Sequence, residues 1–168
     1  MVTPLGPESL ALMNLRTLLS NSSDFQTWVS AADSTEALDS ILYASTQGQD
    51  IPHPIAMVKF GTSFSSAADS IDSGHNFAGT ENGSLNLVFE DSTDQGEDSE
   101  ADNLVTFMNT VGQIIEDIWD LSGDEVDSTP QLNVMEVTRV GPIKKVSLTD
   151  DDDSEYFFQA EYEILWHA

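Results

Sequence analysis

The chain has 168 residues and a formal net charge of −25, because 30 acidic residues stand against only 5 basic ones. Its hydrophobic content, 39%, is that of a folded protein, and at this length one core can bury roughly 70% of the surface of the unfolded chain. The scarcity of lysine and arginine excludes nucleic-acid binding by phosphate neutralisation and argues against adhesion to an anionic membrane. The absence of cysteine excludes disulfides, thiol catalysis and cysteine-based zinc sites.

Neither a targeting segment nor a membrane span is expected. The N-terminus lacks a basic stretch followed by an apolar run, so no signal peptide is predicted. No apolar run approaches the ~18 residues that a membrane helix needs. We therefore expect a single α+β domain over residues 1–168 that makes no membrane contact.

The N-terminal quarter is predicted to be helical. Apolar residues at helical spacing indicate a helix over 8–19, and Glu8 in its first turn suits the positive end of the helix dipole. A break precedes a short segment that begins at Phe25. Residues 34–43 are then predicted to form another short helix, started by Ser34 or its neighbour.

Two strands with polar connections follow. Residues 55–60 and 85–90 are rich in apolar side chains and are predicted strands. The stretch 61–84 is dominated by small and polar residues, which predicts an extended loop or a loose hairpin arm. The stretch 90–103 is strongly acidic and has no basic residue, so self-repulsion predicts a solvated loop.

The most regular stretch is 101–121, where apolar residues recur at three- and four-residue steps and predict a long helix. Asp102 or Asn103 is expected to cap its start. Val105 and Trp119 widen the apolar face, which indicates a helix covered on more than one side. The helix is predicted to be a core element against the sheet.

Three strands are predicted to close the chain, over 132–140, 143–148 and 156–166. The last is the clearest, because its apolar residues alternate and place one face in the core and the middle of the other in water. A run of aspartates at 150–153 is predicted to be the turn of an antiparallel pair. This order of elements indicates an α+β fold in which N-terminal helices and a long central helix pack on a mainly antiparallel sheet.

No pattern predicts catalysis, a cofactor or a metal. His53, His75 and His167 are not spaced as metal ligands, and the phosphate-binding, dinucleotide and serine-hydrolase motifs do not occur. The acidic run at 150–153 could attract a hard cation such as calcium, but an exposed turn is the simpler interpretation. We expect no catalytic, cofactor-binding or metal-binding residues.

Charge segregation suggests how the chain could bind copies of itself. Arg139, Lys144 and Lys145 are three of the five basic residues, and they fall on the strands after the long helix. A confined basic patch on an otherwise acidic subunit predicts head-to-tail contacts, which form rings when they close. The alternative is that these residues only guard a sheet edge against aggregation.

The acidity itself has three interpretations. A carboxylate-rich surface stays hydrated in a saline medium, it does not stick to DNA that moves past it, and it can imitate DNA to capture a DNA-binding protein. The last interpretation predicts an alternative function, an acidic DNA-mimic inhibitor that binds a basic DNA-binding protein.

The order of elements, together with the aromatic-rich block FFQAEYEILW at 157–166, resembles the tail terminator and tail-completion (neck) proteins of tailed bacteriophages. The resemblance implies a non-enzymatic virion protein, assembled in the host cytoplasm as a homo-oligomer, a hexameric ring at the head-proximal end of the tail. Its implied partners are the tail-tube protein and a head–tail connector protein. It also implies that an acidic face lines a channel through which DNA passes without specific binding.

Overall fold

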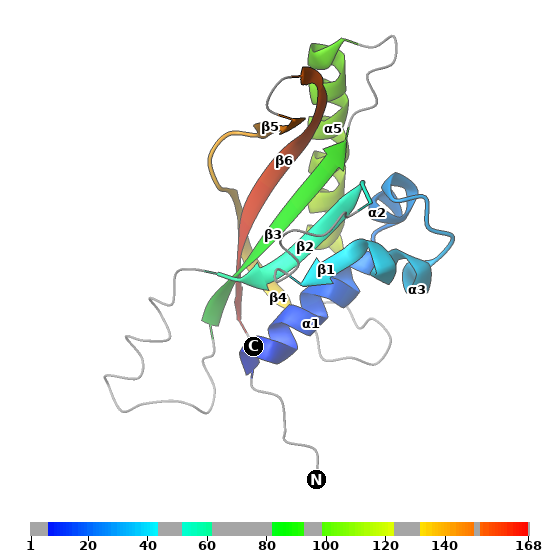
Figure 1. The fold of residues 1–168 in the computed structure, drawn as a ribbon. Helices are drawn as coiled ribbons and strands as arrows, with labels where there is room; N and C mark the ends of the chain where they lie inside the picture. Colours follow the sequence, from blue (N-terminus) through cyan, green and yellow to red (C-terminus); the bar gives the residue numbers. More distant parts are fainter. Residues whose placement is uncertain are drawn as a thin grey trace.

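The structure, a computed structural model, describes residues 7–43, 52–61, 82–92, 99–122, 132–149 and 152–167. Their elements, in chain order, are α1 (Pro7–Ser20), α2 (Ser23–Trp28), α3 (Ser34–Ala37), the 3₁₀ turn η1 (Leu38–Ser40), β1 (Ile41–Tyr43), β2 (Ile55–Phe60), β3 (Asn82–Ser92), α5 (Glu100–Leu121), β4 (Asn133–Arg139), β5 (Lys144–Thr149) and β6 (Asp152–His167) (Figure 1). Helices and a mostly antiparallel sheet make this an α+β protein, as predicted.

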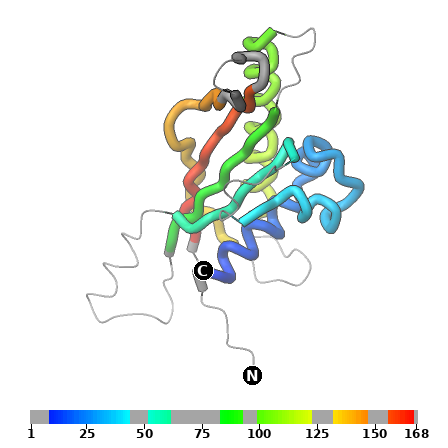
Figure 2. Tube along the Cα trace, viewed as in Figure 1, coloured from blue at the N-terminus to red at the C-terminus, as the bar shows by residue number. Residues whose placement is uncertain are grey.

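The sheet is organised around β6. The strand order is β1-β2-β3-β6-β4, and β5 also pairs with β6. On one edge β6 pairs antiparallel with β3, and on the other edge it pairs with β5 in its first half and with β4 in its second half. Figure 2 shows β3 and β6 running side by side as the longest strands of the sheet. Among the described strands, β1 and β2 form the parallel pair.

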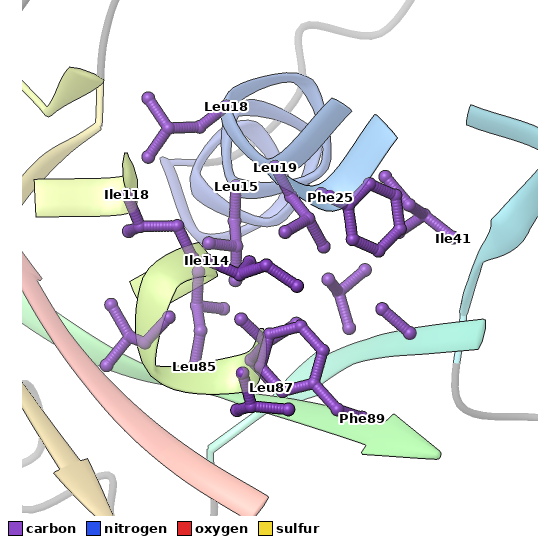
Figure 3. Packing of buried hydrophobic residues seen from close by; sticks show 14 of the residues in the cluster. Leu15, Leu18, Leu19, Phe25, Ile41, Leu85, Leu87, Phe89, Ile114 and Ile118 are labelled. Atoms are coloured by element: carbon purple, nitrogen blue, oxygen red, sulfur yellow. The ribbon is translucent and has the colours of Figure 1, made fainter. Parts of the chain in front are cut away.

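One face of the sheet, called here the covered face, packs against the helices. It carries the alternate positions of β3 and β6 that include Leu87 and Phe158, whereas Asn86 and Gln159 lie on the opposite face. Figure 3 shows α1 and α5 over the covered face, with Leu15, Leu19 and Ile114 between these helices and β3. The fully buried residues in this layer include Leu15, Leu19, Phe25, Leu85, Leu87, Phe89, Val111, Ile114, Ile118 and Ile164.

Trp28 joins the short helix α2 to this core. Its ring centroid lies 5.9 Å from that of Phe25, 5.8 Å from that of Phe89 and 6.4 Å from that of Phe107. Aromatic pairs at such distances stabilise by about 0.5–1.5 kcal/mol beyond their area burial. The predicted short segment that begins at Phe25 is therefore a helix that packs against β3 and α5.

The start of α5 differs from the prediction. Ser99 caps the helix, since its side chain accepts a hydrogen bond from the Asp102 backbone N–H, and its hydroxyl donates to the Asp102 carboxylate at 2.8 Å. The predicted caps, Asp102 and Asn103, thus lie inside the helix. The predicted acidic loop over 90–103 is wrong at both ends, because Glu90 belongs to β3 and the helix begins at Glu100, while 93–98 lie outside the described residues.

Three other element boundaries also differ from the prediction. The helix predicted over 34–43 ends early, because Ile41 pairs with Ala56 and the chain becomes a strand. The tertiary pairing overrides the apolar spacing there. Most of the predicted arm at 61–84 lies outside the described residues, and its last three positions belong to β3. In the aspartate turn, Asp152 and Asp153 already belong to β6.

Candidate functional site

The three basic residues singled out from the sequence do not form one patch. In the ladders of β6, Arg139 is in register with Tyr162 and Lys145 with Phe158, both at alternate positions on the covered face. Lys144 is one step along the strand and therefore points to the opposite face. The structure brings Arg139 and Lys145 to one side of the sheet and leaves Lys144 on the other.

Lys145 is engaged inside the subunit. Its Nζ lies 3.0 Å from the Glu100 Oε2 and 4.6 Å from the centroid of the Tyr156 ring. It thereby ties the start of β5 to the first turn of α5. Glu100 is exposed, so the contribution of this ion pair to stability is at most about 1 kcal/mol.

Two other basic residues are engaged as well. Arg16 donates from Nη2 to the Leu38 carbonyl at 2.8 Å and from Nε to the Ile41 carbonyl at 3.1 Å. Lys59 Nζ lies 3.0 Å from Glu161 Oε1. Both side chains therefore serve the fold, by joining α1 to β1 and β2 to β6.

Arg139 and Lys144 differ from these three. Both are exposed, and neither forms an ion pair within the part of the chain that the structure describes. Next to them on the same edge of the sheet, Met135 and Val140 are 54% and 42% exposed. We call these four residues the β4–β5 edge. It combines two exposed cations, one directed to each face of the sheet, with exposed apolar surface.

A second exposed apolar surface lies on α5. Val105, Met108 and Trp119 are 55%, 44% and 42% exposed, and Gly112 and Ile115 complete a three- and four-residue spacing between them. These five residues are called the outer stripe of α5. They lie one position beyond the buried residues Phe107, Val111, Ile114 and Ile118, which form the core stripe.

The prediction that α5 is covered on more than one side is not met within the described residues. The core stripe is buried against the sheet and α1, but Val105 and Trp119 remain exposed. Glu116 and Asp120 are also exposed and adjoin the outer stripe at helical spacing. Since α5 contains no basic residue, the outer stripe is an apolar surface with an acidic border.

A polar network on the opposite face of the sheet was missed from the sequence. Glu90 is 9% exposed; its Oε2 lies 3.2 Å from His53 Nε2, and its Oε1 accepts from Gln159 Nε2 at 2.7 Å. Burial alone would raise the pKa of Glu90, but the hydrogen bonds from His53 and Gln159 outweigh it and hold the pKa below its ordinary value. The His53 ring also lies 5.1 Å from the Phe157 ring, centroid to centroid.

Glu161 forms the second half of this network. Its Oε1 accepts from Asn86 Nδ2 at 2.7 Å and pairs with Lys59. Burial raises the pKa of Glu161, yet the hydrogen bonds and the nearby charges of Lys59 and Lys144 lower it overall. These positions of β6 were predicted to be in water, but Gln159 and Glu161 are only partly exposed. The alternating polar positions in both strands were the signal that could have revealed the network.

Nothing in this network forms a metal centre. Among the described residues there is no group of three or more His, Asp or Glu side chains placed to hold a metal ion. Of the three histidines, His53 is used as above, His75 lies outside the described residues, and only the backbone of His167 is described. The network links β2, β3 and β6 through these contacts, although the buried Oδ1 of Asn86 has no hydrogen-bond partner among the described residues.

Comparison with protein-family models found no matching family, and comparison with curated proteins found no significant match. A search of the described helices for one long and apolar enough to cross a membrane also found none. The structural basis for a functional proposal is therefore the pair of exposed surfaces, the outer stripe of α5 and the β4–β5 edge.

Proposed function

We propose that this chain is a non-enzymatic structural subunit of a virion, a tail terminator or neck protein. Copies of it form a ring at the head-proximal end of a phage tail. The resemblance to tail terminator proteins implies that this ring is a hexamer. The ring joins the tail-tube protein to the head–tail connector protein.

Charge segregation is the observation that carries this proposal. The subunit has a net charge of −25, and its two cations without an ion pair in the described structure, Arg139 and Lys144, are confined to one edge of the sheet. Like-charged copies repel one another unless their contacts bring opposite charges together. A basic edge that meets an acidic surface of the next copy supports self-assembly through heterologous contacts, the kind that make rings.

The acidic surface suits a conduit for DNA. Phosphate groups are repelled by carboxylates, and the chain has too few cations to hold a duplex by counterion release. DNA moving through a ring of such subunits would meet no site that binds it. Such a surface suits a neck location and does not suit a role in packaging DNA by direct binding.

The proposal is tested by assembly. Purified protein should form a closed ring in native mass spectrometry and light scattering, or should form one when tail tubes of the same virus are supplied. Electron microscopy should then show the ring at one end of each tube. A monomer at every salt concentration, together with bare tube ends, would refute the proposal.

A DNA-mimic inhibitor is the second candidate, and the charge of α5 favours it. All charged residues of this 22-residue helix are acidic, and Asp102, Glu116 and Asp120 lie exposed along it. This function predicts tight, salt-sensitive capture of a basic DNA-binding protein from a host lysate. Capture of such a protein in equimolar amount, displaced by duplex DNA, with no binding to tail tubes, would favour the inhibitor.

A further inference from the structure

The outer stripe of α5 has the form of a helix-packing surface. Its five residues follow the same three- and four-residue spacing as the core stripe, which is the spacing of side chains that meet a partner along a helix. Three of them are more than 40% exposed in the subunit. Exposed apolar residues that occur singly need no explanation, but a continuous row of them marks an interaction site.

Gly112 also indicates that the outer stripe of α5 is an interaction site. Glycine is among the least favourable residues inside a helix, and a Cβ at Gly112 would meet nothing within 4 Å in the subunit. Packing within the subunit therefore does not require a glycine at this position. In the middle of the outer stripe, the missing side chain leaves a notch that lets another chain approach the helix closely.

The border of the outer stripe sets the chemistry of what binds it. Glu116 and Asp120 give the stripe an acidic rim, and α5 supplies no cation to balance them. A second α5 docked on the first would place acid against acid. A surface that offers apolar side chains together with cations fits both the stripe and its rim.

The β4–β5 edge of the same chain has this chemistry. Met135 and Val140 supply exposed apolar surface, and Arg139 and Lys144 supply cations that form no ion pair within the described structure. β4 pairs with β6 on one side only, so among the described strands its other edge is open. Basic residues on such an edge oppose pairing with another strand, so a contact between chains at this edge is made by side chains.

We propose that the outer stripe of α5 receives the β4–β5 edge of a second copy of this chain. Glu116 and Asp120 of one copy then lie against the edge of the next copy, from which Arg139 and Lys144 project on the two sides of the sheet. The two surfaces differ, so the contact is heterologous and each copy can both give and receive it. The inference deepens the proposed function and rests on it in one respect, that repetition of the contact builds the ring.

The apolar half of the contact is tested with two matched variants. Met108→Gln alters the outer stripe, and Met13→Gln makes the same change on α1 at nearly equal exposure, 44% against 45%. Met108→Gln should weaken self-association about tenfold or more in sedimentation equilibrium, while Met13→Gln should leave it unchanged. Circular dichroism confirms that both variants fold. Equal association by the two variants would overturn the inference.

The charged half is tested by reversal. The pair Arg139→Glu with Lys144→Glu should abolish association, and so should the pair Glu116→Lys with Asp120→Lys. The protein that carries all four changes should associate again, because each reversed surface meets its reversed partner. Failure of the fourfold variant to associate, while it remains folded, would contradict the proposed pairing.

Tail tubes separate this inference from the proposed function. If the wild-type protein caps tubes and Met108→Gln caps them equally well, the function stands and the inference fails. If the wild-type protein associates through the outer stripe but never caps a tube, the inference stands and the virion function fails. A wild-type protein that is monomeric under all conditions and leaves tubes bare refutes both.

Discussion

The two faces of the sheet differ in chemistry, because apolar side chains pack on the covered face and a polar network lies on the opposite face. Two neighbouring residues of β3 show this difference. Asp91 is in register with Phe158 on the covered face and accepts a hydrogen bond from Trp28 Nε1 at 3.1 Å. Glu90, one step earlier, lies on the opposite face with His53 and Gln159. Burial raises the pKa of Asp91 despite the hydrogen bond from Trp28, whereas the hydrogen bonds on Glu90 lower its pKa.

The contrast separates two sources of stability. The covered face gains from burial of apolar side chains, which does not depend on pH, and it tolerates a charge poorly. The opposite face gains from carboxylates that are more stable as anions in the folded state than in the unfolded one, so its contribution is lost in acid. Substitutions on the two faces should therefore differ in size and in pH dependence.

The largest expected effect comes from the covered side. Val111 is fully buried in the core stripe, and Val111→Asp would bury an unpaired charge at a cost of about 4 kcal/mol or more. Val105→Asp, the same change on the outer stripe at 55% exposure, should alter the free energy of unfolding by no more than about 0.5 kcal/mol. Urea denaturation compares the two. Similar losses would mean that the stripes do not differ as described.

On the opposite face, Glu90→Gln should cost about 1.5–3 kcal/mol at neutral pH, the usual value of hydrogen bonds to a charged group. The folded-state pKa of Glu90 is lowered, so its contribution is present above its unfolded pKa, about 4.3, and is lost as pH falls through the folded pKa. The difference between the variant and the wild type should thus shrink below about pH 4. Denaturation at neutral and acid pH measures it, and a pH-independent difference would contradict the assignment.

Asp91→Asn should have a smaller effect of the opposite sign. Because the folded-state pKa of Asp91 is raised, its ionised form costs stability above that pKa, and the cost disappears as pH falls toward the unfolded value. Asn keeps an oxygen that can accept from Trp28 and carries no charge. The variant should be more stable at neutral pH by up to about 1 kcal/mol, with the gain lost in acid. A loss of stability at neutral pH would show that the charge is favourable.

The smallest effect is expected at Lys145. Its pairing with Glu100 is partly exposed, so Lys145→Gln should change stability by less than about 1 kcal/mol and by less still at high salt. Lys144 is the neighbouring residue and points to the opposite face. Lys144→Gln should change stability by no more than Lys145→Gln does, but it should weaken self-association. If both variants associated equally, the proposal that Lys145 acts within the subunit and Lys144 acts between subunits would be wrong.

Local pattern in the sequence was enough for much of the fold. The helix over 101–121 was predicted from apolar spacing, and the observed α5 begins one residue earlier. The strand predicted over 156–166 lies within β6, and the alternate apolar positions predicted to face the core are buried except Tyr162, which is partly buried. Such elements are predictable because their periodicity is written in neighbouring residues.

The candidate site was only partly predictable. The sequence drew attention to Arg139, Lys144 and Lys145, but the grouping failed because consecutive strand residues face opposite ways. Only the structure separated Lys145, held by Glu100, from the two cations that form no ion pair among the described residues. Val105 and Trp119 of the outer stripe were predicted to widen the apolar face of the helix, and the sequence could not show that they remain exposed.

By itself, the sequence determined the fold class, the long helix, the closing strand and the strongly acidic surface, because each depends on composition or on short-range spacing. The tertiary structure decided that Ile41 extends a sheet, that His53 meets Glu90 and that Val105 lies exposed although Leu104 is partly buried and Phe107 is buried. These outcomes depend on which segments become neighbours and on the register in which they pair. The spacing of residues along the chain does not specify either of these directly.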